Sequence, residues 1–132
     1  GGTLTGNPLA LAAVRATLST TLLDDDSARM IELATEWTSG VEGTYRKHEL
    51  SWHVQQLGAR AEYWFSPPPR NGAEAAAAAD PELEAYMHLH ALNRGVLLTP
   101  FHNMALMSPA HRRTDVERHT EVFAEAVDTL VG

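Results

Sequence analysis

Residues Gly2–Pro8, which read GTLTGNP, and the Leu9-Ala10 pair after them decide how this 132-residue chain is interpreted. Asn7 and Pro8 favour a helix start, because asparagine caps free N–H groups and proline at the first helical position has no N–H to lose. A glycine-rich turn that opens into a helix presents main-chain donors and a partial positive charge to an anion. The turn therefore predicts either a phosphate-binding site or, as the commoner case, a capped helix after a flexible loop.

Composition limits the classes of partner. The formal net charge is −7, from 10 basic and 17 acidic residues, so we expect neither nucleic acid nor an anionic membrane surface as a partner. Cysteine is absent, which excludes disulfides and removes the preferred ligands of structural zinc. No apolar run approaches the length of a membrane span. We expect a cytoplasmic protein, and the start at Gly1-Gly2-Thr3 indicates a segment of a longer chain.

Two helices follow the opening turn. The first is expected from Pro8 to about Thr21, and the second begins at the acidic run from Asp24, where carboxylates favour the positive end of the helix dipole. Gly40 and Gly43 weaken the second half of that helix. One stripe of the second helix is expected to be buried, and its members are Met30, Ala34, Trp37, Val41 and Tyr45.

The pattern then changes to strands. Residues 52–57 and 60–65 are rich in aromatic and β-branched residues, and Gly58-Ala59 between them predicts a tight hairpin. Prolines 67–69 end the second strand. The alanine run within 70–80 predicts a short helix, with a mobile lobe as the alternative.

The last third predicts two helices and short strands. Asp80-Pro81 starts a helix that Arg94-Gly95 ends, and its buried stripe is Leu83, Tyr86, Met87 and His90. Val96–Thr99 is expected as a short buried strand, with Met104–Met107 as another. A capping box at Thr114-x-x-Glu117 starts the last helix, which is expected to bury Val116, Phe123, Val127 and Leu130. The expected fold is α+β: a small, mainly antiparallel sheet of three to four strands, covered on one face by helices and preceded by a long N-terminal linking helix.

Side chains that carry chemistry give weak signals. His88 and His90 point to different faces of a helix and cannot share a metal, so no metal site is assigned. Lys47 ends a charged helix and is interpreted as a solvated surface residue. Two sets remain ambiguous or are rejected. Arginines 60, 70 and 94 either bind carboxylates or form surface salt bridges; Ser108, His111 and Asp115 lack the features of a hydrolase triad.

The opening motif resembles a known family. Gly2–Ala10 is similar to the G-T-x-x-G-N-P-L-A signature of class III, fold-type I aminotransferases that use pyridoxal phosphate (PLP), in particular their glutamate-1-semialdehyde aminomutase branch. Arg94–Pro100, the segment Ser108–His111 and the closing helix resemble the family's C-terminal small domain. The resemblance implies that residues 1–21 form a phosphate-contact turn and a linking helix from a missing large domain, and that residues 22–132 form the small domain.

The same resemblance implies the site and the partners. Gly2 and Thr3 would contact the cofactor phosphate held by the other subunit of a homodimer, and His102 and Asn103 are candidates for the wall of the pocket for an amine or amino-acid substrate. The family's lysine that binds PLP lies upstream, so this chain holds no catalytic residue and is expected to be inactive and free of PLP by itself. Residues 101–107 lack the acidic residue of the aminomutase branch, which leaves aminomutase and aminotransferase equally open. The alternative is a stand-alone, non-catalytic α+β interaction domain.

Overall fold

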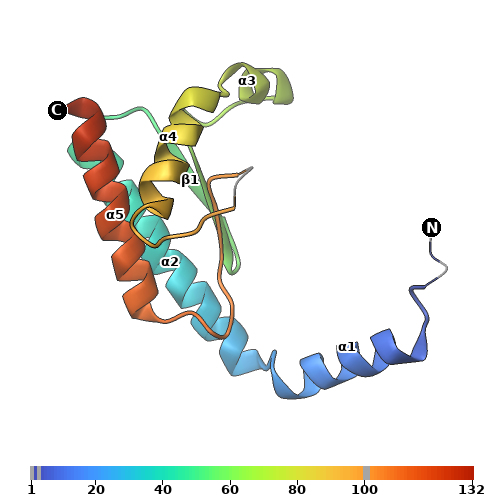
Figure 1. The fold of residues 1–132 in the computed structure, drawn as a ribbon. Helices are drawn as coiled ribbons and strands as arrows, with labels where there is room; N and C mark the ends of the chain where they lie inside the picture. Colours follow the sequence, from blue (N-terminus) through green and yellow to red (C-terminus); the bar gives the residue numbers. More distant parts are fainter. Residues whose placement is uncertain (1, 3, 100–101) are drawn as a thin grey trace.

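The computed structural model describes residues 2, 4–99 and 102–132. Within them lie five helices and one antiparallel sheet of three strands (Figure 1), so the α+β fold expected from the sequence is confirmed. The elements in chain order are α1 (Pro8–Thr20), α2 (Asp24–Lys47), β1 (His53–Leu57), β2 (Arg60–Trp64), α3 (Gly72–Ala77), α4 (Pro81–Leu92), β3 (Met104–Leu106) and α5 (Arg113–Val131).

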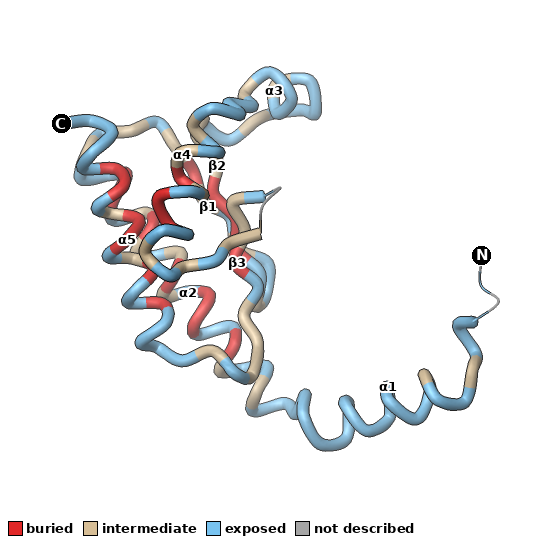
Figure 2. The backbone as a smooth tube through the Cα atoms, in the orientation of Figure 1, coloured by how far each residue is buried: buried red, intermediate tan, exposed pale blue. Residues whose placement is uncertain are grey.

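Helix α1 stands apart from the rest of the chain. Its N-cap is Asn7, whose side-chain oxygen accepts a hydrogen bond of 2.9 Å from the N–H of Ala10. Every residue of α1 is exposed except the half-buried Ala10, and the helix extends away from the other elements (Figures 1 and 2). The helix therefore forms through its cap and its alanine-rich composition rather than through packing within this chain.

Strand β2 lies at the centre of the sheet, between β1 and β3. Gly58 adopts a φ of 59° in the reversal between β1 and β2, a conformation that glycine reaches without a Cβ clash. Across the sheet Glu62 is paired with Gln55 on one side and with Met104 on the other. Side chains alternate along a strand, so Tyr63 faces the helices and Glu62 faces the opposite side of the sheet.

The core lies between the sheet and helices α2, α4 and α5 (Figure 2). Trp37 of α2 stacks on Tyr63 of β2 with ring centroids 5.9 Å apart, and Phe123 of α5 contacts Tyr63 edge to face at 5.0 Å. His119 packs against Trp37 with ring centroids 4.9 Å apart. These rings join α2, α5 and the central strand, so one aromatic cluster fixes the helices on one face of the sheet.

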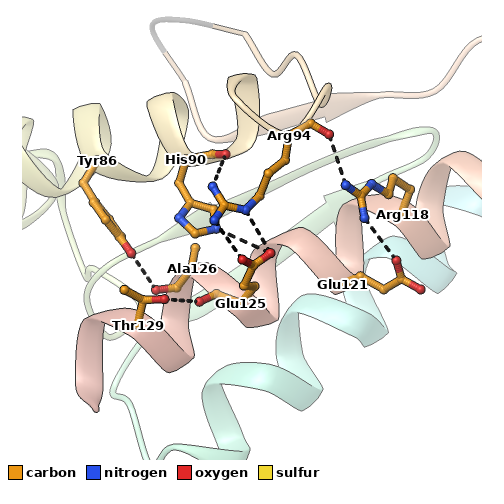
Figure 3. Close-up of polar contacts among 8 residues, drawn as sticks. All are labelled: Tyr86, His90, Arg94, Arg118, Glu121, Glu125, Ala126 and Thr129. Atoms are coloured by element: carbon orange, nitrogen blue, oxygen red, sulfur yellow. Dashed lines mark hydrogen bonds and ion pairs between the residues drawn. The ribbon is translucent and has the colours of Figure 1, made fainter.

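Polar contacts hold the end of α4 to α5 (Figure 3). The Arg94 guanidinium makes two hydrogen bonds, of 2.9 and 2.8 Å, to the Glu125 carboxylate, and Arg118 donates to the Arg94 carbonyl. Tyr86 donates to the Ala126 carbonyl at 3.0 Å. The Glu125 hydrogen bonds raise the pKa of Arg94, and the Arg94 guanidinium lowers the pKa of Glu125.

The prediction of a buried strand at Val96–Thr99 is wrong. Gly95 turns the chain with a φ of 79°, and the N–H of Val96 donates to the Ala91 carbonyl to close the end of α4. Residues 96–99 then continue without regular structure, and Leu97 is 73% exposed. The apolar composition that indicated a strand therefore belongs to an open segment along the side of the sheet.

Two details of α5 also differ from the prediction. The capping box lies two residues earlier than Thr114, because the Asp115 carboxylate accepts from the N–H of Arg112, the N-cap residue, at 2.8 Å. Leu130 was expected to be buried but is 43% exposed near the free end of the helix. The expected burial of Val116, Phe123 and Val127 is confirmed.

Candidate functional site

The N-terminal turn is closed by its own hydrogen bonds. The Gly2 carbonyl accepts from the N–H of Thr5 at 3.2 Å and from the Thr5 hydroxyl at 2.6 Å, and Asn7 Nδ2 donates to the Leu4 carbonyl at 2.7 Å. The Thr5 hydroxyl is thus used inside the turn. Gly2 is exposed where the predicted phosphate contact requires it, whereas Thr3 lies outside the described residues.

His102 and Asn103 lie at the entry to β3, but on different faces of it. The main-chain carbonyl of Asn103 accepts from the N–H of Tyr63, which extends the ladder with β2. Alternation along the chain therefore puts the two side chains on opposite sides of the sheet. Both border a small hollow of about 10 Å³, with Glu84 and His88 of α4 on its other side. The hollow has room for about one water molecule, not for a substrate.

Sequence reasoning missed a carboxylate beside these residues. Glu62 lies on the central strand, its side chain is only 11% exposed, and Oε1 is 3.3 Å from Nδ1 of His102. Oε2 of the same carboxylate is 2.9 Å from Nη2 of Arg60. A charged residue within the predicted strand was the available signal, but its contact with His102 depends on the pairing of β2 with β3.

A larger hollow of about 560 Å³ lies between the open segment 95–99, β3 and the first half of α5. Trp37 and Val116 supply apolar surface to it, and Asp115 and Arg118 supply charge. Its size falls within the range of small-molecule sites. Its lining includes none of the residues singled out from the sequence as cofactor or substrate contacts.

The Ser108–His111 segment forms a turn rather than part of a triad. Nδ1 of His111 accepts from the N–H of Ser108 at 2.8 Å and is 3.0 Å from its hydroxyl. Asp115 is occupied as the cap of α5. Arg29 of α2 donates to the carbonyls of Pro109 and His111 and holds the turn against the helix. These contacts close a loop and do not assemble an activated nucleophile.

The candidate cations are all paired with carboxylates of the same chain. Arg60 contacts Glu62, Arg70 contacts Glu74, and Arg94 contacts Glu125, so the salt-bridge alternative describes them. Lys47 ends α2 and lies 3.1 Å from Asp128, whose pKa it lowers. Lys47 is therefore an exposed structural cation.

The buried histidines face apolar or helical surroundings. Burial lowers the pKa of His119 to about 4, because the neutral ring packs against Trp37 and Phe123. Burial, and then the charge of Arg94, also lower the pKa of His90. In the part of the chain that the structure describes, no three His, Asp or Glu side chains are grouped as a metal site, and no helix has the length and apolar character to cross a membrane.

Comparison with solved structures identifies the class. The fold matches a glutamate-1-semialdehyde-aminomutase from Pseudomonas aeruginosa PAO1 with a TM-score of 0.93 and 49% identity, over 98% of this chain and 29% of that protein. It also matches an omega-transaminase from Sphaerobacter thermophilus with a TM-score of 0.83 and 19% identity, a likeness of fold. The chain is thus a fragment with the fold of the fold-type I aminotransferases, as the opening motif indicated.

Sequence relatives are more specific within that class. The chain is 34% identical to the glutamate-1-semialdehyde 2,1-aminomutase of Opitutus terrae over 98% of its length, and 34% identical to that of Thermomicrobium roseum over 96%. It spans about 30% of the length of these relatives, so it is homologous to one part of an aminomutase. No protein-family model matches the chain.

Proposed function

We propose that this chain is the small-domain part of a longer PLP-dependent enzyme that moves an amino group between an amine or amino acid and a carbonyl compound. The observation that carries the proposal is the match to aminomutase structures over 98% of the chain but only 29% of theirs. PLP supplies the electron sink for such chemistry. The residues of this chain would hold the cofactor phosphate and border the substrate.

The exposed helix α1 supports a missing large domain. Leu9 is 80% exposed and Leu18 is 60% exposed, and Arg15 is the only charged residue of the helix. A helix that is apolar on most of its surface is normally buried on several sides. We propose that residues 1–21 link the two domains and that α1 packs against the large domain and the partner subunit of a homodimer.

The phosphate contact is proposed for Gly2 and Thr3. The turn that they begin is already closed by Thr5 and Asn7, and its exposed Gly2 precedes a capped helix N-terminus. These features fit the phosphate end of PLP. The chain offers no second attachment, because its single lysine pairs with Asp128. We therefore propose that the isolated chain neither retains PLP nor catalyses transfer.

The test uses the complete protein that contains this segment. We expect it to bind PLP, seen as visible absorbance, and to transfer an amino group from an amine or amino acid to a keto acid. Thr3→Ala should weaken PLP binding, whereas Thr20→Ala, which removes a hydroxyl bonded only within α1 and to Thr21, should not. A complete protein that neither binds PLP nor transfers amino groups would refute the proposal and favour the interaction-domain alternative.

A further inference from the structure

The Glu62 carboxylate is nearly excluded from water and shared by two partners. Its side chain is 11% exposed, Oε2 lies 2.9 Å from Arg60, and Oε1 lies 3.3 Å from Nδ1 of His102. A charged group in such a position requires polar partners, because burial without them is costly. Arg60 balances the charge, so the contact with His102 is an additional feature of the same carboxylate.

The sheet register explains how His102 reaches Glu62. Glu62 pairs with Met104 across β2 and β3, and His102 precedes Met104 by two residues. Residues two apart share a face, so His102 and Glu62 lie on the side of the sheet opposite Tyr63. The core helices pack on the Tyr63 side, and none of the helices in residues 4–99 and 102–132 covers the other (Figure 1). The pair is thus on the open face of the small domain.

The contact determines which ring nitrogen of His102 is available. A carboxylate only accepts hydrogen bonds, so Nδ1 must carry the proton that faces Glu62. In the neutral ring the lone pair is then on Nε2, on the far edge of the imidazole. The His102 side chain is 56% exposed, so Nε2 is free to accept a hydrogen bond from a ligand.

We propose that Glu62 is a positioning residue that holds His102 with Nε2 as a hydrogen-bond acceptor for the amino group of the substrate. The substrate part rests on the proposed function, because amino-group transfer supplies a ligand with a cationic donor. A donor with positive charge also suits an acceptor backed by a carboxylate. Arg60 does not contact the substrate and acts through Glu62.

The orientation of His102 is tested directly by nuclear magnetic resonance on the 132-residue chain. Long-range 1H–15N correlations, recorded where the ring is neutral, should show His102 with its proton on Nδ1. Glu62→Ala should return the ring to the tautomer mixture of a free side chain, and Glu74→Ala, which removes a carboxylate bonded only to Arg70 and Asn71, should not. A proton on Nε2 in the unmodified chain would overturn the proposal, and that measurement needs no variant to fold.

The substrate role is tested by kinetics of the complete protein. Glu62→Gln and His102→Leu should each raise KM for the amino donor at least about tenfold, with a smaller change in kcat and unchanged absorbance of bound PLP. Unchanged KM with PLP bound would overturn this inference and leave the proposed function intact. A complete protein without PLP would instead overturn the proposed function and the substrate role together, while the resonance measurement would still decide the Glu62–His102 contact.

Discussion

Gly40 of α2 and Thr120 of α5 approach so closely that no side chain fits at position 40. A Cβ added to Gly40 would lie 2.8 Å from Cγ2 of Thr120, and the Thr120 hydroxyl is bonded to the Val116 carbonyl, which fixes its rotamer. Gly43, less than one turn further, has open space where its Cβ would be. Both glycines weaken the helix, but only Gly40 permits the contact of α2 with α5.

Alanine substitutions should therefore act in opposite directions at these two glycines. Gly43→Ala should raise the free energy of unfolding by about 0.5–1 kcal/mol, because alanine is the better helix former. Gly40→Ala should lower it by about 1–3 kcal/mol, because the helices must separate. Urea denaturation of both variants measures the difference. Equal stabilisation by the two substitutions would show that α2 and α5 are not in close contact at Thr120.

The burial of His119 should make the fold sensitive to acid. The pKa of His119 is about 4 in the folded chain, against an ordinary value of 6.5. Between these values the unfolded chain takes up a proton that the folded chain does not, so stability is retained above pH 6.5 and falls as the pH decreases toward 4. This group should cost about 2 kcal/mol between pH 7 and pH 5.

Urea titrations at pH 7 and pH 5 check the effect of His119. His119→Leu should remove this part of the pH dependence, although it changes packing at both pH values. If the original chain and the variant lose the same stability between pH 7 and pH 5, His119 is not responsible.

The exposed apolar surface of α1 should cause self-association. Leu11 and Leu18 lie two turns apart on one face and are 55% and 60% exposed. Light scattering should show oligomers of the 132-residue chain at high concentration, because large exposed apolar patches associate. Leu11→Glu with Leu18→Glu should shift the chain toward monomer, whereas Ser19→Glu on the same helix should have less effect. A clean monomer of the original chain at high concentration would contradict this expectation.

Removal of α1 should leave the rest of the fold unchanged. Because its residues are exposed apart from the half-buried Ala10, residues 22–132 should retain the thermal midpoint of the longer chain to within a few degrees. Differential scanning calorimetry at low concentration makes the comparison. A large loss of stability would mean that α1 packs on the small domain in solution.

Local signals predicted most of the elements correctly. Asn7 and Asp80 cap α1 and α4 as expected, and Gly58 forms the reversal of the hairpin. The failure at residues 96–99 has a physical cause, since composition identifies apolar residues but not whether a neighbouring strand exists to pair with them. Leu130 was assigned to the core by periodicity alone, which does not show where the packed surface of α5 ends.

The candidate site was less accessible to sequence reasoning. His102 was identified, but Glu62 lies 40 residues earlier and reaches it only through the register of β2 and β3. Periodicity predicts the strands, not their alignment. The roles of Gly2 and Thr3 come from the family resemblance and stay predictions, because the phosphate that they would contact belongs to a longer protein.

The central claim is that this chain contributes the small domain while the lysine that binds PLP lies elsewhere in the protein. Incubation with PLP, reduction by borohydride and peptide mass spectrometry test it directly, on both the 132-residue chain and the complete protein. We predict no pyridoxyl group on Lys47 in either sample, and one on a lysine outside residues 1–132 in the complete protein. Stoichiometric pyridoxylation of Lys47 would contradict the account.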